Sequence, residues 1–453
     1  RGCHWQIGAR FVASWYNSID CIMHDSSVDK IPVAGATPQA TTTAGRLHIP
    51  TLPRTFVALS HYNYRLYWFG QIVSYSGSWM QTLAQGWLVL RLTDSPFLLG
   101  LIGFINSVPV LIFSLWGGVV ADRHAKRDLL TVTQTLSMIL AFILALLTFT
   151  GRVRFEHVAI IAFWLGVVNA FDVPARHAFV AEVVGKEDLT NAIALNSTAF
   201  NIARVFGPAI AGILVAAVGE AWAFALNGFS FVAVIVSLRA MRLPRWDSNG
   251  PGGSPWRRLR EGLSYVRHSS ATLGLLLIVG TTSLFGMAYA TLMPVFARDV
   301  LGVGAGGQGL LMSAVGTGAL AGALMVATFG SRGRRGRLLT AGNLLLPIAL
   351  IIFANARWFP LSLAAIACAG AGLIAQNVTA NTLIQTLAPD ELRGRVMSVW
   401  TVIILGLTPF GSFQAGLVAE RFGAPVAVTV GALVCLAAAV FAQVRLPHLR
   451  RLG

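Results

Sequence analysis

Charged residues are scarce in this chain. Asp, Glu, Lys and Arg make up 11% of its 453 residues, whereas a soluble domain carries about 25%. Apolar residues make up 55%, and the mean hydropathy is +0.68. These values exclude a large soluble enzyme and indicate an integral membrane protein.

Cysteine is also rare. Cys368 and Cys435 lie inside apolar segments, while Cys3 and Cys21 lie near the start of the chain, so no disulfide framework is expected. No spacing of Cys and His matches a zinc site, and we expect no metal and no cofactor. No phosphate-binding loop of the form Gly-x4-Gly-Lys-Ser/Thr occurs, so ATP is not expected to drive the protein directly. The histidines are scattered near loops without paired carboxylates, which argues against a membrane enzyme.

Acidic residues are outnumbered, with 18 Asp and Glu against 34 Lys and Arg, for a net charge of +16. The basic residues lie in short loops between apolar runs rather than in one cluster. This distribution predicts membrane orientation and no binding of nucleic acid.

Long apolar runs begin at about residue 64. A helix of about 20 apolar residues crosses the hydrocarbon core of a bilayer, and a helix satisfies its own backbone hydrogen bonds there. Twelve spans are predicted, at 64–91, 96–121, 128–150, 156–180, 189–217, 220–239, 271–297, 307–329, 337–355, 359–386, 391–419 and 424–444.

Alternate loops differ in charge. The loops after the even-numbered spans, with the C-terminus, hold 21 Lys and Arg, and the opposite loops hold 6. Because basic loops stay in the cytoplasm, both termini are predicted to be cytoplasmic.

The spans divide into two sets of six. We expect a disordered N-terminal extension over 1–58, a first six-helix bundle over 59–239, a second over 271–446 and a cytoplasmic tail over 447–453. The connection 240–270 begins as a flexible linker and continues as an amphipathic helix on the membrane surface, with apolar residues at helical spacing (Trp256, Leu259, Leu263, Val266) among arginines.

The two sets resemble each other. Gly100-Leu101 and Gly309-Leu310 are related by an offset of 209, and Ala211-Gly212 and Ala415-Gly416 by an offset of 204. The predicted fold is therefore an all-α membrane protein of twelve transmembrane helices in two pseudo-symmetric six-helix bundles. Transporters of this design bind substrate between the halves and rock to alternate its access.

One short loop carries a cluster of charges between spans two and three. It reads Gly118-x3-Asp122-Arg123-x2-Lys126-Arg127, which resembles the loop motif of the major facilitator superfamily. The similarity extends from about residue 69 to residue 423, toward a branch of siderophore and drug exporters. It is carried by residues 77–81, 85–93, 203–209 and 389–397.

The resemblance implies a gate. In the outward-open state this loop would pack against the start of span eleven, where Asp390, Arg393 and Arg395 are its expected partners. A carboxylate at a helix N-terminus contributes about 0.3–2 kcal/mol, enough to bias two conformations without locking either. The alternative is that the charges of the loop only enforce topology.

Two stripes of polar side chains follow helical spacing. Span one carries Gln71, Ser74, Ser78, Gln81 and Gln85, and span ten carries Asn377, Asn381 and Gln385. By resemblance, spans one and ten line the central cavity, so we expect both stripes to contact substrate. The alternative is hydrogen bonding between helices.

Two charges lie inside spans. Asp172 in span four is the candidate for proton coupling, and Arg204 in span five is a candidate for binding an anionic or catechol-bearing substrate. Arg204 could instead pair with Asp172, and Asp172 could lie beside Arg176 near the cytoplasmic mouth.

A small-residue motif follows Arg204. Gly207, Pro208 and Gly212 resemble the exporter-type motif of span five in the superfamily, and the proline and small residues indicate a hinge or a close helix contact.

The sequence therefore predicts a proton-coupled exporter of a small amphiphilic molecule, such as a drug, macrolide or siderophore. Its partners are this substrate, protons and the lipid bilayer, and it is expected to act as a monomer in the bacterial plasma membrane. A lipid or lysophospholipid flippase is the alternative within transport, and a non-transporting assembly subunit is the alternative outside it.

We expect Asp122→Asn to insert into the membrane normally but to transport poorly, because the gating loop loses its acidic group. Surface labelling measures insertion and substrate efflux measures transport. Unimpaired efflux by a normally inserted variant would contradict the gating role.

Overall fold

The computed structural model describes residues 54–243, 255–330 and 334–445. These residues are helical almost throughout, with no strand among them. Residues 1–53 of the expected N-terminal extension lie outside the described residues, and so does the expected tail 447–453. The last residues of the expected extension belong to η1 (Arg54–Ser60), a short helix that packs on the first bundle. There the backbone N–H of Ala58 donates to Asn191 Oδ1 at 2.9 Å.

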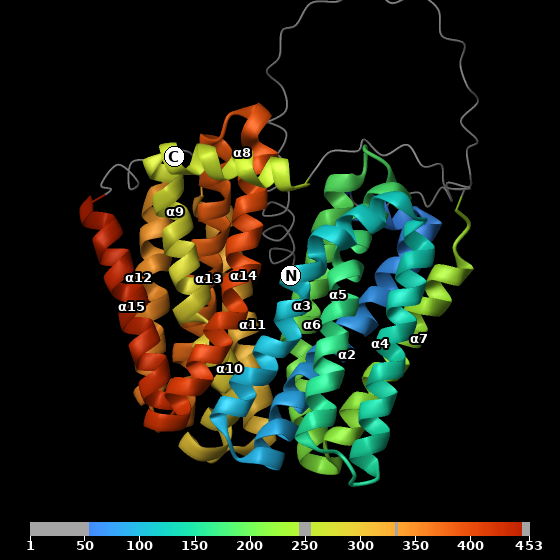
Figure 1. The fold of residues 1–453 in the computed structure, drawn as a ribbon, viewed down its shortest axis with the longest axis vertical. Coiled ribbons are helices and arrows are strands. Elements are labelled where there is room, and N and C mark those ends of the chain that lie inside the picture. The colour runs from blue at the N-terminus through green and yellow to red at the C-terminus, as the bar shows by residue number, and fades with distance from the viewer. Residues whose placement is uncertain (1–53, 244–254, 331–333, 446–453) are drawn as a thin grey trace, which may run out of the picture.

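The long helices form two bundles that lie side by side (Figure 1). The first contains α2 (Tyr62–Thr93), α3 (Pro96–Arg123), α4 (Lys126–Phe149), α5 (Phe155–Val184), α6 (Leu189–Val218) and α7 (Glu220–Ala240). The second contains a broken span made of α9 (Ser270–Thr281), η2 (Thr282–Gly286), α10 (Ala288–Val295) and η3 (Phe296–Val300), then α11 (Gly304–Phe329), α12 (Arg335–Asn355), α13 (Phe359–Leu387), α14 (Asp390–Phe422) and α15 (Ala424–Arg445).

Eleven segments of the described chain are long and apolar enough to cross a membrane. The broken span 270–300 counts as one of them. The remaining long helix, α2, has 32 residues and packs against α6 and α7, but it is more polar than the others. The predicted all-helical architecture of two six-helix bundles is confirmed, and α2, predicted as the first span, is the least apolar of the long helices.

The two bundles use the same pairings. In the first, α3 packs on α5 and α4 on α7, and in the second, α11 packs on α13 and α12 on α15. Between the bundles, α3 packs on α14 and α6 on α11, which are the same contact related by the pseudo-twofold axis. The turns after α6 and α14 also match, because Gly219 (φ 90°) and Gly423 (φ 86°) adopt the left-handed backbone that favours glycine.

The amphipathic helix predicted in the linker is α8 (Pro255–His268), which lies across one end of the second bundle (Figure 1). Val266 is buried in a cluster with α14 residues, and Glu261 forms an ion pair with Arg395 at 2.9 Å. A Cβ atom at Gly262 would lie 2.3 Å from the carbonyl oxygen of Arg395. This helix is therefore docked on α14 by its own side chains and backbone.

The two bundles meet at the end formed by the turns 93–96, 150–155, 218–220, 300–304, 355–359 and 422–424, here called the sealed end. Two pairs of glycines hold the helices together there. Gly100 of α3 packs on Gly416 of α14, and Gly212 of α6 packs on Gly309 of α11. A Cβ built on one glycine of either pair would lie 2.9–3.0 Å from the Cα of the other. Such small residues let helix backbones approach closely in a membrane.

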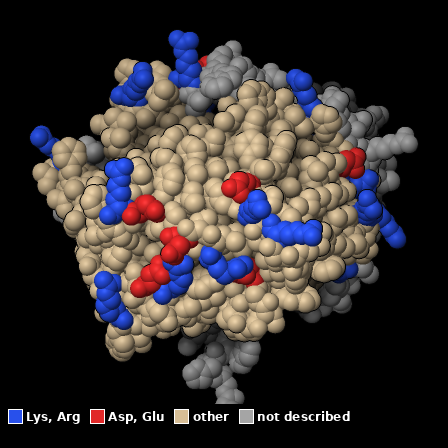
Figure 2. All heavy atoms as spheres, turned by 60° about the horizontal axis from the view of Figure 1, so that its bottom comes forward, with Lys and Arg blue, Asp and Glu red and all other residues tan. Residues whose placement is uncertain are grey.

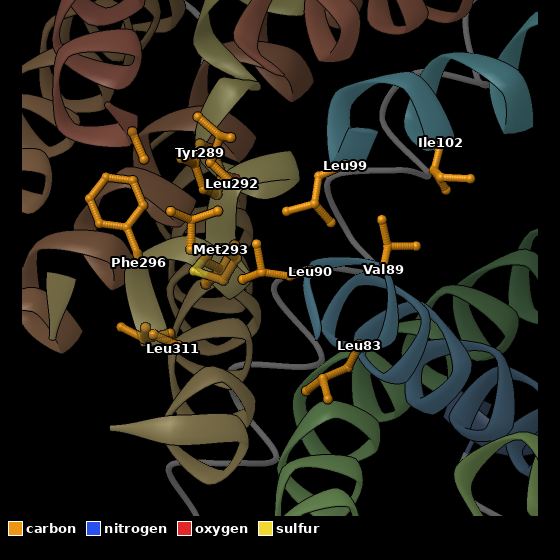
Figure 3. Packing of buried hydrophobic residues seen from close by; sticks show 14 of the residues in the cluster. Leu83, Val89, Leu90, Leu99, Ile102, Tyr289, Leu292, Met293, Phe296 and Leu311 are labelled. Carbon is orange, nitrogen blue, oxygen red and sulfur yellow. The ribbon is translucent and has the colours of Figure 1, made fainter. Parts of the chain in front are cut away.

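Apolar side chains fill the space beside these glycine pairs (Figure 3). Leu90 and Leu99 of the first bundle and Leu292 and Met293 of the second belong to one buried cluster and are each at most 4% exposed. Phe97 and Phe104 of α3 stack on rings of α14, with centroids 5.5–5.6 Å apart. Their edge-on and tilted geometry is the favourable one for aromatic pairs.

Two polar clasps lie at the rim of the sealed end. Arg298 of the second bundle forms an ion pair with Asp94 at the end of α2. Glu420 of α14 accepts hydrogen bonds from the Ser95 hydroxyl at 2.8 Å and from the Phe97 backbone N–H at 3.0 Å, so it caps the start of α3 from the other bundle. Figure 2 shows acidic and basic side chains interspersed over this end.

The bundles diverge toward the opposite end, which carries the turns 123–126, 184–189 and 387–390 and is here called the motif end (Figure 1). Between the described residues of the motif end, no hydrogen bond or ion pair joins the two bundles. The structure is therefore sealed at one end and divided at the other.

Gly309→Ala should weaken the seal, because its Cβ would lie 2.5 Å from the carbonyl oxygen of Pro208. Overpacking of this kind costs about 1–3 kcal/mol. Spin labels at the exposed positions 152 and 357 should report a longer distance between the bundles than in the parent protein.

The matched control is Gly306→Ala, on the same helix, because a Cβ there meets nothing within 4 Å. Equal distances in both variants and the parent protein would contradict the role of these two glycine pairs, here called the glycine seams.

Candidate functional site

The loop motif lies at the motif end, where α3 ends at Arg123 and α4 begins at Lys126. Asp122 and Arg123 are exposed, and Asp122 forms no hydrogen bond or ion pair within the described part of the chain. Lys126 lies 3.6 Å from Glu182 of α5, and Arg127 lies 3.6 Å from Asp128. A Cβ at Gly118 would meet nothing within 4 Å. Neither glycine nor acid of this motif is engaged in the conformation observed.

The expected gate partners on α14 are engaged within their own bundle. Arg393 binds Asp390 at 2.5 Å, and Arg395 binds Glu261 of α8. The structure does not bring Asp122 together with these residues.

The polar stripe of α2 faces the interior of the first bundle over much of its length. Gln71, Ser74 and Gln81 are buried, and the Gln81 carbonyl oxygen accepts a hydrogen bond of 2.6 Å from Asn227 of α7. Ser78 is exposed and Gln85 is partly buried. For Gln81, and for Gln71, which accepts a hydrogen bond from Arg176 of α5, the structure favours hydrogen bonding between helices over contact with substrate.

Asp172 is 2% exposed and lies between α4 and α5. Its Oδ1 accepts hydrogen bonds from the Thr133 hydroxyl at 2.7 Å and from the Gln134 amide at 2.8 Å. Its Oδ2 pairs with Arg176 one turn along α5, and Arg176 also donates to Gln71. The sequence left two candidate partners for Asp172, Arg204 and Arg176. The structure pairs Asp172 with Arg176, and Arg204 does not contact it.

We call Asp172 and the residues that bond to it the charged node. The second bundle has uncharged residues at the equivalent positions, here called the neutral node. Gln376 lies 204 residues after Asp172, and Asn343 lies 209 residues after Gln134, which are the same two offsets that relate the glycine pairs. The Gln376 amide donates to the Thr282 hydroxyl at 2.8 Å. The carbonyl oxygens of Gln376 and Asn343 and the Thr379 hydroxyl are buried without a hydrogen-bond partner.

A pocket of about 200 Å³ lies beside this neutral node. It is lined by Thr282, Ser283, Met287, Leu373, Asn377, Ile404 and Thr408. The π-helical turn η2 contributes Thr282 and Ser283, and such turns often occur at functional sites. Asn377 of the predicted stripe lines this pocket. Asn381 and Gln385 lie further along α13, where they bond to each other at 2.6 Å.

Arg204 lies on α6 among aromatic rings of the first bundle. Its guanidinium carbon is 5.8 Å from the centre of the Trp79 ring, and it forms no ion pair with any described residue. Phe200, one turn earlier, lies 5.9 Å from Trp79 and 5.6 Å from Tyr75, measured between ring centroids. Arg176 in turn lies 5.2 Å from the Tyr75 ring.

The exporter-type motif of α6 serves two contacts. A Cβ at Gly207 would lie 2.9 Å from Trp79 Cβ, so this glycine holds α6 against α2. Pro208 and Gly212 contact Gly309 of α11, so they form part of the seal between the bundles. The close-contact interpretation of this motif agrees with the geometry.

Several site residues were not predicted. Thr133, Gln134, Gln376 and Thr282 lie next to other polar residues on mainly apolar helices, and no charge or motif distinguishes them. Gln376 could have been found by applying the offset of 204 to Asp172. The aromatic residues around Arg204 were not predicted as site residues, because aromatic residues occur in every span and no motif distinguishes these.

Comparison with known proteins agrees with this architecture. A family model described as a transmembrane secretion effector matches residues 54–452. The staphyloferrin A transporter of Staphylococcus aureus is 26% identical over 77% of this chain and 87% of its own length. The multidrug efflux pump Tap of Mycolicibacterium fortuitum is 26% identical over 85% of this chain and 95% of its own.

The fold has solved counterparts. A bacterial homologue of the lysosomal transporter Spinster, in an inward-facing and occupied conformation, matches with a TM-score of 0.68 over 88% of this chain and 98% of that one, at 14% identity. The nucleoside transporter NupG (D323A mutant) matches with a TM-score of 0.71 over 85% of this chain and 99% of that one, at 11% identity.

Asp172→Asn should destabilise the protein by about 3–5 kcal/mol, because Arg176 is left without its counter-charge inside the bundle. Thermal unfolding in detergent measures the loss. Adding Arg176→Gln should restore part of it, because both charges are then removed. Glu182→Gln, at the more exposed Lys126 pair, should cost less than about 1 kcal/mol. An unchanged melting temperature for Asp172→Asn would contradict the importance of this ion pair.

Proposed function

The chain belongs to the transmembrane secretion effector family of the major facilitator superfamily, and we propose that it exports a small amphiphilic molecule by proton-coupled alternating access. The observation that supports this most directly is the pair of glycine seams at the sealed end. They join helices of different bundles and are related to each other by the internal repeat. Two similar rigid bundles that meet along these seams can rock, so that one end opens while the other closes.

The loop motif supplies the other half of this exchange. Asp122 is unpaired while the motif end is divided, and its expected partners on α14 are paired within the second bundle, Arg393 with Asp390 and Arg395 with Glu261. When the seams part, the acid of the loop would meet the start of α14. Arg298–Asp94 and the cap by Glu420 would be lost at the same time. The polar contacts that would be exchanged at each end are few and of modest strength.

Substrate would bind between the bundles. The pocket beside Asn377 contains hydroxyl and amide groups, Met287 and aliphatic side chains, but no charged side chain. Such a lining suits a bulky, partly apolar molecule better than a sugar or an inorganic ion. The relatives named above carry a siderophore or drugs, which is consistent with this substrate class.

Proton coupling is assigned to Asp172. This acid lies in the interior of a span, paired with Arg176 one turn along the same helix. At 2% exposure the carboxylate is closed to water in the present conformation. Proton exchange would therefore follow a movement of Arg176, when the bundles rock.

The orientation follows from the loop charges. With the motif end and both termini in the cytoplasm of a bacterial cell, the observed conformation would be open inward, and the chain would act as a monomer in the plasma membrane. Periplasmic labelling of a single cysteine at position 152 tests this orientation.

Expression in an efflux-deficient bacterium should raise resistance to at least one antibiotic or increase secretion of a catechol compound. In proteoliposomes, addition of that substrate should then release protons across the membrane. Substrate movement without a proton flux would contradict the coupling. Movement of labelled lysophospholipid in place of drugs and catechols would identify a flippase instead.

A further inference from the structure

Arg204 is the feature of the inner surface that the alternating-access scheme leaves unused. It lies inside a span, where an ionised side chain is costly unless another group compensates its charge. Within the described part of the chain no carboxylate forms an ion pair with it, whereas Arg176 has Asp172. The charge of Arg204 is therefore available to a ligand.

The groups around Arg204 are aromatic. Arg204 lies over the Trp79 ring, and Trp79 packs against Phe200. Phe200 also packs against Tyr75, which lies beside Arg176. Phe200 is 41% exposed, so this row is not closed off by the bundle interior. We refer to Tyr75, Phe200, Trp79 and Arg204 as the aromatic row. A flat ring can stack on such a row while its acidic group meets the guanidinium.

Arg204 lies on the part of α6 that packs on α11 of the second bundle. The carbonyl oxygen of Arg204 would lie 3.1 Å from a Cβ at Gly316 of α11, and the charge of Arg204 also reaches Tyr289 of α10. Tyr289 belongs to the same broken span as Thr282, Ser283 and Met287, which line the neutral pocket. One molecule between the bundles could therefore present an anionic ring to the first bundle and its uncharged part to the second.

We propose that the aromatic row is the specificity-determining subsite of the exporter, and that it selects substrates with an anionic aromatic group over cationic ones. This inference rests on the proposed function and narrows its substrate class. A catecholate or aryl carboxylate satisfies the charge of Arg204 and stacks on Trp79, whereas a cationic drug is repelled by the same charge.

Binding to the full chain in lipid nanodiscs tests the proposal with three matched probes. These are 2-naphthoate (an aromatic anion), decalin-2-carboxylate (the saturated anion of the same shape) and 2-naphthyltrimethylammonium (an aromatic cation). The parent protein should bind 2-naphthoate most tightly. Arg204→Gln should weaken that binding about tenfold or more, because a charge-assisted hydrogen bond is lost. Trp79→Leu should reduce the preference for 2-naphthoate over decalin-2-carboxylate by at least threefold.

Two further variants keep the result interpretable. Arg204→Lys retains the charge and should recover part of the affinity, which a purely structural arginine would not predict. Arg152→Gln removes one charge at the exposed sealed end and should leave all three affinities unchanged. Binding of 2-naphthoate within twofold of the parent in a folded Arg204→Gln variant, or tighter binding of the cation by the parent protein, would overturn the proposal.

The outcome is separable from that of the proposed function. Efflux of antibiotics or catechols without any preference among the three probes would leave the exporter intact and remove the subsite. Preference for 2-naphthoate in a protein that moves no compound across proteoliposomes would leave the subsite intact and remove the exporter.

Discussion

The two glycine contacts at the sealed end are the constraint on which the rest of the structure depends. Helices of different bundles approach there so closely that a Cβ would not fit between them, with Gly100 against Gly416 and Gly212 against Gly309. A membrane offers little hydrophobic force between helices, so close backbone packing has to supply much of the attraction. The leucines, phenylalanines and polar clasps of the sealed end reach their partners because these glycines let the backbones approach.

In the proposed alternating access, the glycine seams are the contacts that open and close. Each seam combines one glycine from the first repeat position and one from the second, so the repeat produces two equivalent contacts on opposite sides of the pseudo-twofold axis. Such an interface closes or opens as a whole. The charges of the loop motif are exposed or paired within their own bundle at the divided end, which is the arrangement expected of a gate in its open state.

The bundles share a plan but differ in chemistry. At equivalent positions the first contains Asp172 paired with Arg176, and the second contains Gln376 beside buried polar atoms that lack partners. An ion pair held by several donors makes a rigid node, whereas an incompletely bonded neutral node beside a π-helical turn leaves room for adjustment. The pocket lies next to the second kind. This division suggests that the first bundle provides charge and the second provides an adaptable surface.

The amino-acid sequence by itself determined the spans, the six-plus-six division, the amphipathic helix α8 and the repeat, because each depends on hydropathy, helical period or spacing along the chain. It also identified Gly100 and Gly309 as one pair of equivalent positions, and Gly212 and Gly416 as another. The tertiary structure alone decided what each face touches. Helical period places Gln71 and Gln81 on one stripe of α2, but it does not say that Arg176 and Asn227 occupy the space beside them. Likewise it places Asp172 and Arg204 inside spans, and only the packing of α4, α5 and α6 pairs the first and leaves the second without a carboxylate. The physical reason is that local sequence sets the direction of a side chain relative to its own helix, whereas its partners come from helices distant in sequence.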